Sequence, residues 1–160
     1  MQLAQGLINL HEHCNPSCVT HNFRKGECTA RFTDATRQQL TGIDCDKCYA
    51  FPGSEDGKRP DFILLFVGGT ESAPRWLVLE MKGRVSSPGR IVDQLQAGAD
   101  AIRSDPHFQV QKPPRQLTPL ILHDGHIRAD DLGRKHVYFF GKRYEIHYPR
   151  CTDELDKFLA

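Results

Sequence analysis

The sequence has no excess of charge of either sign, no long hydrophobic run and no leader-like start. Its 21 basic and 20 acidic side chains give a formal net charge of +1, so bulk charge does not indicate a nucleic-acid partner, and any basic surface must be local. No apolar run reaches the roughly 18 residues of a membrane helix. The first residues, MQLAQGLINLHEHC, lack a basic start followed by an apolar stretch. We therefore expect no secretory signal, no membrane partner and a cytoplasmic location.

Internal repeats, low-complexity tracts and linkers are also missing, which bounds the domain organisation. A chain of 160 residues that is 39% hydrophobic and 26% charged is typical of one soluble, globular domain. We expect a single domain over 1–160. In it a cysteine-rich N-terminal segment, 1–58, is integrated with a core, 59–160.

Hydrophobic patterning predicts the strands and helices of the core. Apolar runs predict strands at 61–67, 76–82 and 117–123, with two further β segments around Gly141. Apolar side chains at steps of three and four residues predict an amphipathic helix over 90–104. This order favours an α/β fold with a mixed central β-sheet flanked by helices.

The N-terminal part and the chain end have weaker patterns. Apolar spacing favours a helix over 1–13, and residues 14–48 read as mostly irregular. The remaining short patterns are strands at 29–33 and 49–51, a helix at 34–40, and a C-terminal helix that Thr152 would cap.

Polar residues stand at the ends of the two strands around residues 61–67 and 76–82. Side chains alternate along a strand, so Glu80 and Lys82 share one face. A register that pairs Asp61 with either of them gathers all three at one end of the hairpin, and a slip of one residue separates them. Two carboxylates about 5–8 Å apart at Cβ can share one hard cation.

Oxygen ligands of this kind suit Mg²⁺ or Mn²⁺, which also keep several waters. The carbonyl of Met81 lies between the two polar side chains and could add a ligand. Lys82 can orient an attacking water, help to deprotonate it, or neutralise charge on a phosphate. These are the groups that phosphodiester hydrolysis requires.

The motif Pro60-Asp61 followed by Glu80-Met81-Lys82 resembles the PD-(D/E)xK nuclease superfamily, which includes restriction endonucleases and Holliday-junction resolvases. The resemblance implies a restriction-endonuclease-like core with the motif on a hairpin of a mixed sheet. It implies that Asp61 and Glu80 bind the metal and that Lys82 assists the water.

The resemblance extends to the segments on either side of the hairpin. Many members carry a glutamine on the helix after the ExK strand, which implies a role for Gln94, with Gln96 as the alternative. Some exonuclease-like members have a tyrosine four residues later, where this chain has Gly98. Several relatives add an acid from the first helix, and Glu12 is the only acid in that segment.

The alternative interpretation of the hairpin is structural. An ion pair between Lys82 and one of the carboxylates at a solvated strand end is common and contributes little stability. A protein that kept the fold but lost activity is a further alternative, and the intact set of Asp61, Glu80 and Lys82 counts against it.

Six cysteines are many for a cytosolic chain of this size. Because no signal peptide is visible, we expect thiols or metal ligands in place of disulfides. Cys14 and Cys18, together with Cys45 and Cys48, form two close pairs whose spacing suits a structural zinc site of four thiolates.

Other cysteine assignments remain open at this point. Cys28 could replace a member of the zinc set, and Cys151 is remote and expected to be a buried thiol. Nearby histidines could also substitute: His11, His13 and His21. Buried, reduced thiols throughout are the alternative to zinc. An iron–sulfur cluster, which some exonucleases of the superfamily carry, fits less well because five of the six cysteines precede the core. A redox role for the Cys45–Cys48 pair is disfavoured, because the adjacent aspartates raise thiol pKa values.

Basic residues form small local groups that could contact phosphates. They are Arg84, Arg90, Lys112, Arg115, Arg134, Lys135, Lys142 and Arg143. For any one of them an ordinary solvated turn is the simpler interpretation, and no base-reading motif is visible.

The sequence therefore predicts a Mg²⁺-dependent nuclease acting on DNA before RNA, with structural zinc. One small domain offers one active site, so cutting both strands would need a homodimer or two binding events. A protein partner for targeting also fits. The rival is a zinc-stabilised, non-catalytic module on the same fold that binds nucleic acid or protein.

Overall fold

The computed structural model describes residues 18–47, 59–68, 73–82, 88–104, 108, 113–125 and 135–159. The helix expected at 1–13 and the strand expected at 49–51 lie outside these residues. Within them the chain is mixed α/β, and a mixed central sheet is confirmed.

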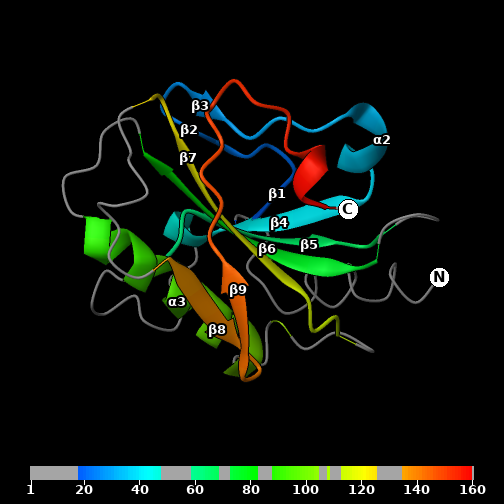
Figure 1. Cartoon of the computed structure of the whole chain (residues 1–160). Coiled ribbons are helices and arrows are strands. Elements are labelled where there is room, and N and C mark those ends of the chain that lie inside the picture. The colour runs from blue at the N-terminus through cyan, green and yellow to red at the C-terminus, as the bar shows by residue number, and fades with distance from the viewer. Residues whose placement is uncertain are drawn as a thin grey trace.

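The central sheet has five strands in the order β1-β4-β5-β6-β7 (Figure 1). All neighbouring strands are antiparallel except β6 and β7, which run parallel. The strands are β1 (Val19–Thr20), β4 (Leu40–Asp44), β5 (Phe62–Phe66), β6 (Arg75–Lys82) and β7 (Leu117–His123). The parallel pair is joined through helix α3 (Pro88–Ser104), the usual way to connect parallel neighbours.

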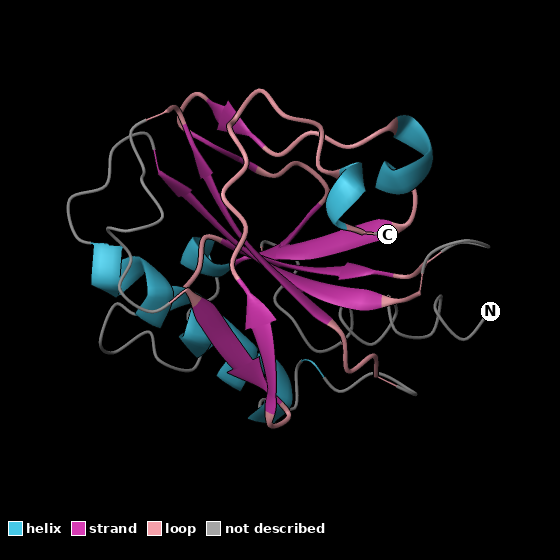
Figure 2. Ribbon diagram, viewed as in Figure 1, coloured by secondary structure: helices cyan, strands magenta, loops and turns pink. Residues whose placement is uncertain are grey.

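Every residue of β5 is buried, and side chains on alternate faces feed two hydrophobic clusters. The first face packs against α3 and against the hairpin of β8 (His136–Phe139) and β9 (Lys142–Glu145). The second face packs against Phe23 and Phe32 and the chain end. Figure 2 shows α3 and the β8–β9 hairpin on one side of the sheet, and α2 (Asp34–Arg37) with the C-terminal turn on the other.

A second small hairpin, β2 (Arg24–Lys25) with β3 (Cys28–Thr29), belongs to the layer that covers the second face. The end of the chain is attached beside it by several bonds. The Leu155 N–H donates to the Arg31 carbonyl at 2.8 Å, and the Asp156 carboxylate accepts from the Thr33 N–H at 2.9 Å. The C-terminal segment thus closes this layer.

Two expectations about the weaker segments need correction. Residues 14–48 are not mostly irregular, because Leu40–Asp44 forms the fully buried strand β4. The C-terminal helix is only a short 3₁₀ turn, η5 (Asp156–Phe158), and Leu155, in place of Thr152, occupies its N-cap. None of the helices in the described part of the chain has the length and hydrophobicity needed to cross a membrane.

Candidate active site

The β5–β6 register brings the motif acids together. The ladder pairs Ile63 with Val78 and Phe62 with Leu79. The ladder ends there, and the Asp61 N–H donates to the Leu79 carbonyl at 3.0 Å, so Asp61 lies at the end of the paired segment, beside the part of β6 that carries Glu80. Of the two parities considered from the sequence, the paired part of the ladder has the one that would gather the acids.

Backbone bonds hold Asp61 where β5 begins. Its N–H donates to the Leu79 carbonyl at 3.0 Å, and its carbonyl accepts from the Cys45 N–H at 3.0 Å. Its carboxylate Oδ2 accepts from the Met81 N–H at 2.8 Å. Asp61 is therefore bonded to β6 and to Cys45, the residue that directly follows β4. One of its carboxylate oxygens is fixed beside the strand that carries Glu80.

A row of residues crosses the sheet at this level. The Cys45 N–H donates to the Asp61 carbonyl, and the Asp61 carboxylate accepts from the Met81 N–H. Glu80 pairs with Ile121, which belongs with Cys45 to the hydrophobic cluster on the α3 face. Glu80 is fully buried, with 0% of its surface exposed, whereas Asp61 is half-buried. A buried carboxylate is stable only when its charge is compensated or removed.

The Met81 carbonyl lies on the Asp61 side of β6. Amide groups two residues apart on a strand face the same neighbour, and both Leu79 and Met81 bond to Asp61. This direction suits the ligand role expected for that carbonyl. Lys82 ends β6, and its side chain lies outside what the structure describes.

His123, which the sequence analysis did not single out, pairs with Lys82 across the parallel ladder. Its Nδ1 accepts from the Gly125 N–H at 2.9 Å, so its Nε2–H donates to the Tyr148 carbonyl at 3.1 Å. Both ring nitrogens thus bond to backbone. His123 orders the chain after β7, and only its place in the ladder could have signalled it.

Gln94 lies one helical turn from the point where α3 crosses β6. A Cβ at Gly98 would lie 3.0 Å from Val78 Cγ1, so the helix crosses β6 closely there. α3 runs back against β6, and one turn towards its N-terminus, about 6 Å, leads from Gly98 to Gln94. Two residues forward along β6, about 7 Å, lead from Val78 to Glu80. The two displacements are similar in length and run the same way, from which we infer that Gln94 is near Glu80.

Gln96, the alternative, is engaged elsewhere. Its Nε2 donates to the Tyr138 carbonyl at 2.9 Å, and its Oε1 accepts from the Tyr138 N–H at 2.9 Å. Both ends of the amide therefore attach α3 to β8. With Gln96 held by β8, Gln94 stays the predicted glutamine of the site.

Gly98→Ala is expected to lower the free energy of unfolding. Overpacking costs about 1–3 kcal/mol, and the better helix propensity of alanine offsets up to about 1 kcal/mol of that. The new Cβ would lie 2.8 Å from Pro60 Cγ and 3.0 Å from Val78 Cγ1. The same crowding explains why no tyrosine fits four residues after Gln94. Urea unfolding measures the change.

Gly89→Ala is the matched control for that substitution, because it lies in the same helix and a Cβ there meets nothing within 4 Å. It should be neutral or slightly stabilising. If Gly98→Ala proved as stable as Gly89→Ala, the close helix–strand crossing would be wrong.

The cysteines differ from expectation at three positions. Cys28 and Cys151 form a disulfide, so neither carries a free thiol. The expectation of a buried thiol at Cys151 is therefore wrong. Cys18 is also disulfide-bonded, so a zinc site that includes it requires the reduced chain. Cys14 and Cys48 lie outside the described residues, as does Glu12.

Cys45 is the free, buried cysteine of the described chain. Burial raises the pKa of its thiol well above the usual range, and four nearby carboxylates, among them Asp61 and Glu80, add to the rise. A thiol in this position favours its protonated form. Its neighbours are the motif acids, which the sequence could not show because β4 was not predicted.

The ion pairs beside the row involve other acids. Lys25 Nζ lies 2.9 Å from both Asp44 Oδ1 and Asp46 Oδ2, and Arg59 Nε lies 3.3 Å from Asp46 Oδ1. Burial alone would raise the pKa of Asp46, but its bonds to Lys25 and Arg59 outweigh this and lower the pKa. Lys25 and Arg59 are thus bound to carboxylates that flank the motif.

Of the basic residues considered from the sequence, three lie outside the described residues: Arg84, Lys112 and Arg134. The others are exposed. The Arg115 guanidinium lies over the Phe140 ring, 4.7 Å from its centroid.

No protein-family model, curated protein or solved structure matches the chain. Among the described residues no cluster of three or more His, Cys, Asp or Glu is placed to hold a metal. The donor groups that the hairpin offers are the carboxylates of Asp61 and Glu80 and the Met81 carbonyl. Mg²⁺, which needs only one or two protein carboxylates, fits that set.

Proposed function

We propose that the protein is a metal-dependent phosphodiesterase that hydrolyses DNA, a nuclease of PD-(D/E)xK type with a restriction-endonuclease-like core. The observation that carries the proposal is the attachment of Asp61 to β6 on both sides of Glu80: its N–H donates to the Leu79 carbonyl, and its carboxylate accepts from the Met81 N–H. The position of Gln94 on α3, one turn from Gly98, supports it independently.

Each residue then has a distinct task. Asp61 and Glu80 would hold the cation, and the Met81 carbonyl would add a ligand. A bound Mg²⁺ or Mn²⁺ polarises a phosphoryl oxygen and lowers the pKa of a bound water. Lys82 orients the attacking water or neutralises developing charge on the phosphate, and Gln94 supports the water or a phosphate oxygen.

DNA is proposed before RNA because the resemblance implies it. Each chain contributes one such site, so a double-strand cut requires a homodimer or two successive binding events. Structural zinc at the paired cysteines remains a proposal for the reduced chain alone.

The test is cleavage of supercoiled plasmid and of single-stranded DNA in Mg²⁺, in Mn²⁺ and in EDTA. Wild type should cut only with the divalent ion. Asp61→Asn keeps an acceptor for the Met81 N–H but removes the charge, and it should be inactive, as should Lys82→Met. Cutting that persists in EDTA, or in folded Asp61→Asn, would contradict the proposal.

One observation favours the second candidate, a non-catalytic binding module on the same fold. Glu80 is fully buried, and a carboxylate that serves a substrate is usually reachable. A folded protein that binds DNA or a protein, yet leaves DNA and RNA intact with either metal, would establish this alternative.

A further inference from the structure

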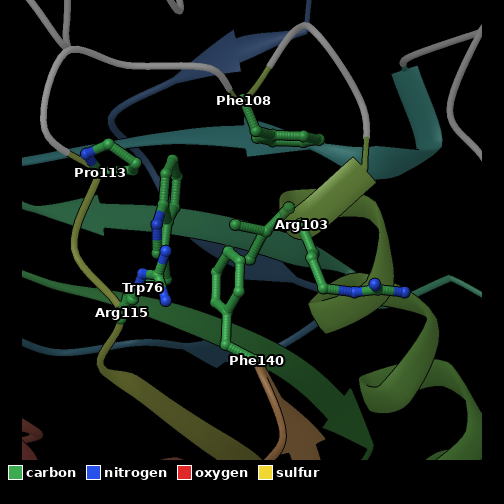
Figure 3. Close-up of a pocket in the computed structure, with 7 residues that line it drawn as sticks. Trp76, Arg103, Phe108, Pro113, Arg115 and Phe140 are labelled. Carbon is green, nitrogen blue, oxygen red and sulfur yellow. The ribbon is translucent and has the colours of Figure 1, made fainter.

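A cavity of about 200 Å³ lies at the end of β6 that is remote from the acids. Trp76 comes from β6, Ile102 and Arg103 from the end of α3, and Phe140 from the turn between β8 and β9. The remaining lining residues are Phe108, Pro113 and Arg115. In Figure 3 the rings of Trp76, Phe108 and Phe140 surround the space, and the Arg103 guanidinium points outward.

The floor of the cavity carries an unused hydrogen-bond donor. Trp76 is 1% exposed and packs edge-to-face with Phe108, their ring centroids 5.9 Å apart. Its indole Nε1 is buried, and it has no hydrogen-bond partner among the residues that the structure describes. A buried donor is costly to leave unpaired, so an acceptor on a ligand in the cavity would be favoured.

The rim is aromatic, cationic and strained. Phe140 is 40% exposed and has φ of +50°, a left-handed conformation that only small or polar residues adopt readily. Gly141 follows with φ of +74°, and the two residues together form the two-residue turn that joins β8 to β9. An adjoining hollow of about 360 Å³ shares Phe140, Arg103 and Arg115, and adds Tyr138, which is 46% exposed.

We propose that this cavity binds an unpaired nucleobase together with its phosphate. Aromatic walls stack on any base, and the Trp76 N–H can donate to a ring nitrogen or carbonyl. Arg115, and Arg103 at the outer edge, suit the phosphate. A cavity of about 150 Å³ holds benzene, so the space accepts one ring system. Two arginines at the rim disfavour a purely apolar ligand, and Asp100 in the adjoining hollow leaves the rim with a small positive balance.

The cavity extends the proposed function, because it lies on the same strand as the acids. Trp76 and Glu80 point to the same face of β6, four residues or roughly 13 Å apart. The crossing of α3 at Gly98 lies between them. At the rise of B-DNA, about 3.4 Å per nucleotide, this distance corresponds to about four nucleotides. A DNA strand with one base in the cavity would therefore have a phosphate near the acids about four nucleotides away.

Binding is tested in EDTA, so that a failure of cleavage and a failure of this proposal are separate results. Trp76 is the only tryptophan in the chain, and its fluorescence reports the cavity directly. Deoxynucleoside monophosphates and a single-stranded oligonucleotide should quench it with saturation. If neither the mononucleotides nor the oligonucleotide quenched it with saturation, the proposal would be overturned.

The variants separate binding from stability. Phe140→Asn should keep or raise the melting temperature, since asparagine tolerates the left-handed conformation, yet weaken ligand affinity about tenfold through lost stacking. Arg115→Gln should weaken it similarly. Arg37→Gln, an exposed arginine on α2, is the control and should change nothing. Equal affinity in Phe140→Asn, Arg115→Gln and the control would overturn the proposal.

Comparing the ligands shows whether the bound base comes from a free nucleotide or from a DNA strand. Quenching by mononucleotides identifies a free nucleotide as sufficient, and quenching by the oligonucleotide alone identifies a strand. A duplex with one extrahelical nucleotide should bind more tightly than its fully paired counterpart. Equal quenching by both duplexes would contradict binding of an unpaired base.

Discussion

Glu80→Gln is expected to reduce Mg²⁺-dependent DNA cleavage by about 10³-fold and to leave the protein folded. A metal ion supplies several kcal/mol of transition-state stabilisation, and about 4 kcal/mol corresponds to that factor. Glutamine fills the same volume at a fully buried position, so the core is preserved while the negative ligand is removed. Initial rates of plasmid cleavage, with circular dichroism to monitor folding, measure the effect.

Glu27→Gln is the matched control, because Glu27 is an exposed glutamate in the turn between β2 and β3, away from the hairpin acids. It should cleave like wild type. Folded Glu80→Gln protein that cut DNA at a rate near that of the control would remove Glu80 from the mechanism.

Removing the Cys28–Cys151 disulfide by the double substitution Cys28→Ala/Cys151→Ala is expected to lower the free energy of unfolding by about 3–5 kcal/mol. The bridge joins residues 123 positions apart, and a cross-link over so long a loop restricts the unfolded chain strongly. It also holds the chain end against the β2–β3 hairpin. Urea unfolding without reductant measures the loss.

Adding reductant to wild type provides the comparison for that variant. Reduction should destabilise wild type more than the double variant, in which this bridge is already absent. A double variant as stable as oxidised wild type would show that the bridge does not form. Disulfides are rare in reducing compartments, so this experiment also bears on the expectation of a cytoplasmic location.

Strong periodicity made the core of the fold predictable. β7 matches its expected bounds, and α3 begins two residues earlier than predicted and ends where expected, because their apolar patterns are long and uninterrupted. β4 escaped prediction because a polar residue and Gly42 interrupt its short sequence. There a Cβ at Gly42 would lie 2.7 Å from Phe23, so the glycine reflects tertiary packing, which local pattern does not show.

The candidate site was predictable in composition and only partly in arrangement. Alternation limited Asp61 and Glu80 to two relative placements, and only the folded register selects one. The choice of Gln94 over Gln96 depends on how β8 docks on α3, a contact between segments far apart in sequence. The disulfide and the Trp76 cavity likewise join distant segments, so no local motif announces them.

The proposed function requires that Asp61 and Glu80 together hold one divalent cation. The most direct measurement counts Mn²⁺ bound at equilibrium, from the electron paramagnetic resonance signal of the free ion, for wild type and for Asp61→Asn/Glu80→Gln. Folded wild type should bind one ion more than the folded double variant. Equal Mn²⁺ binding by the two proteins would contradict it.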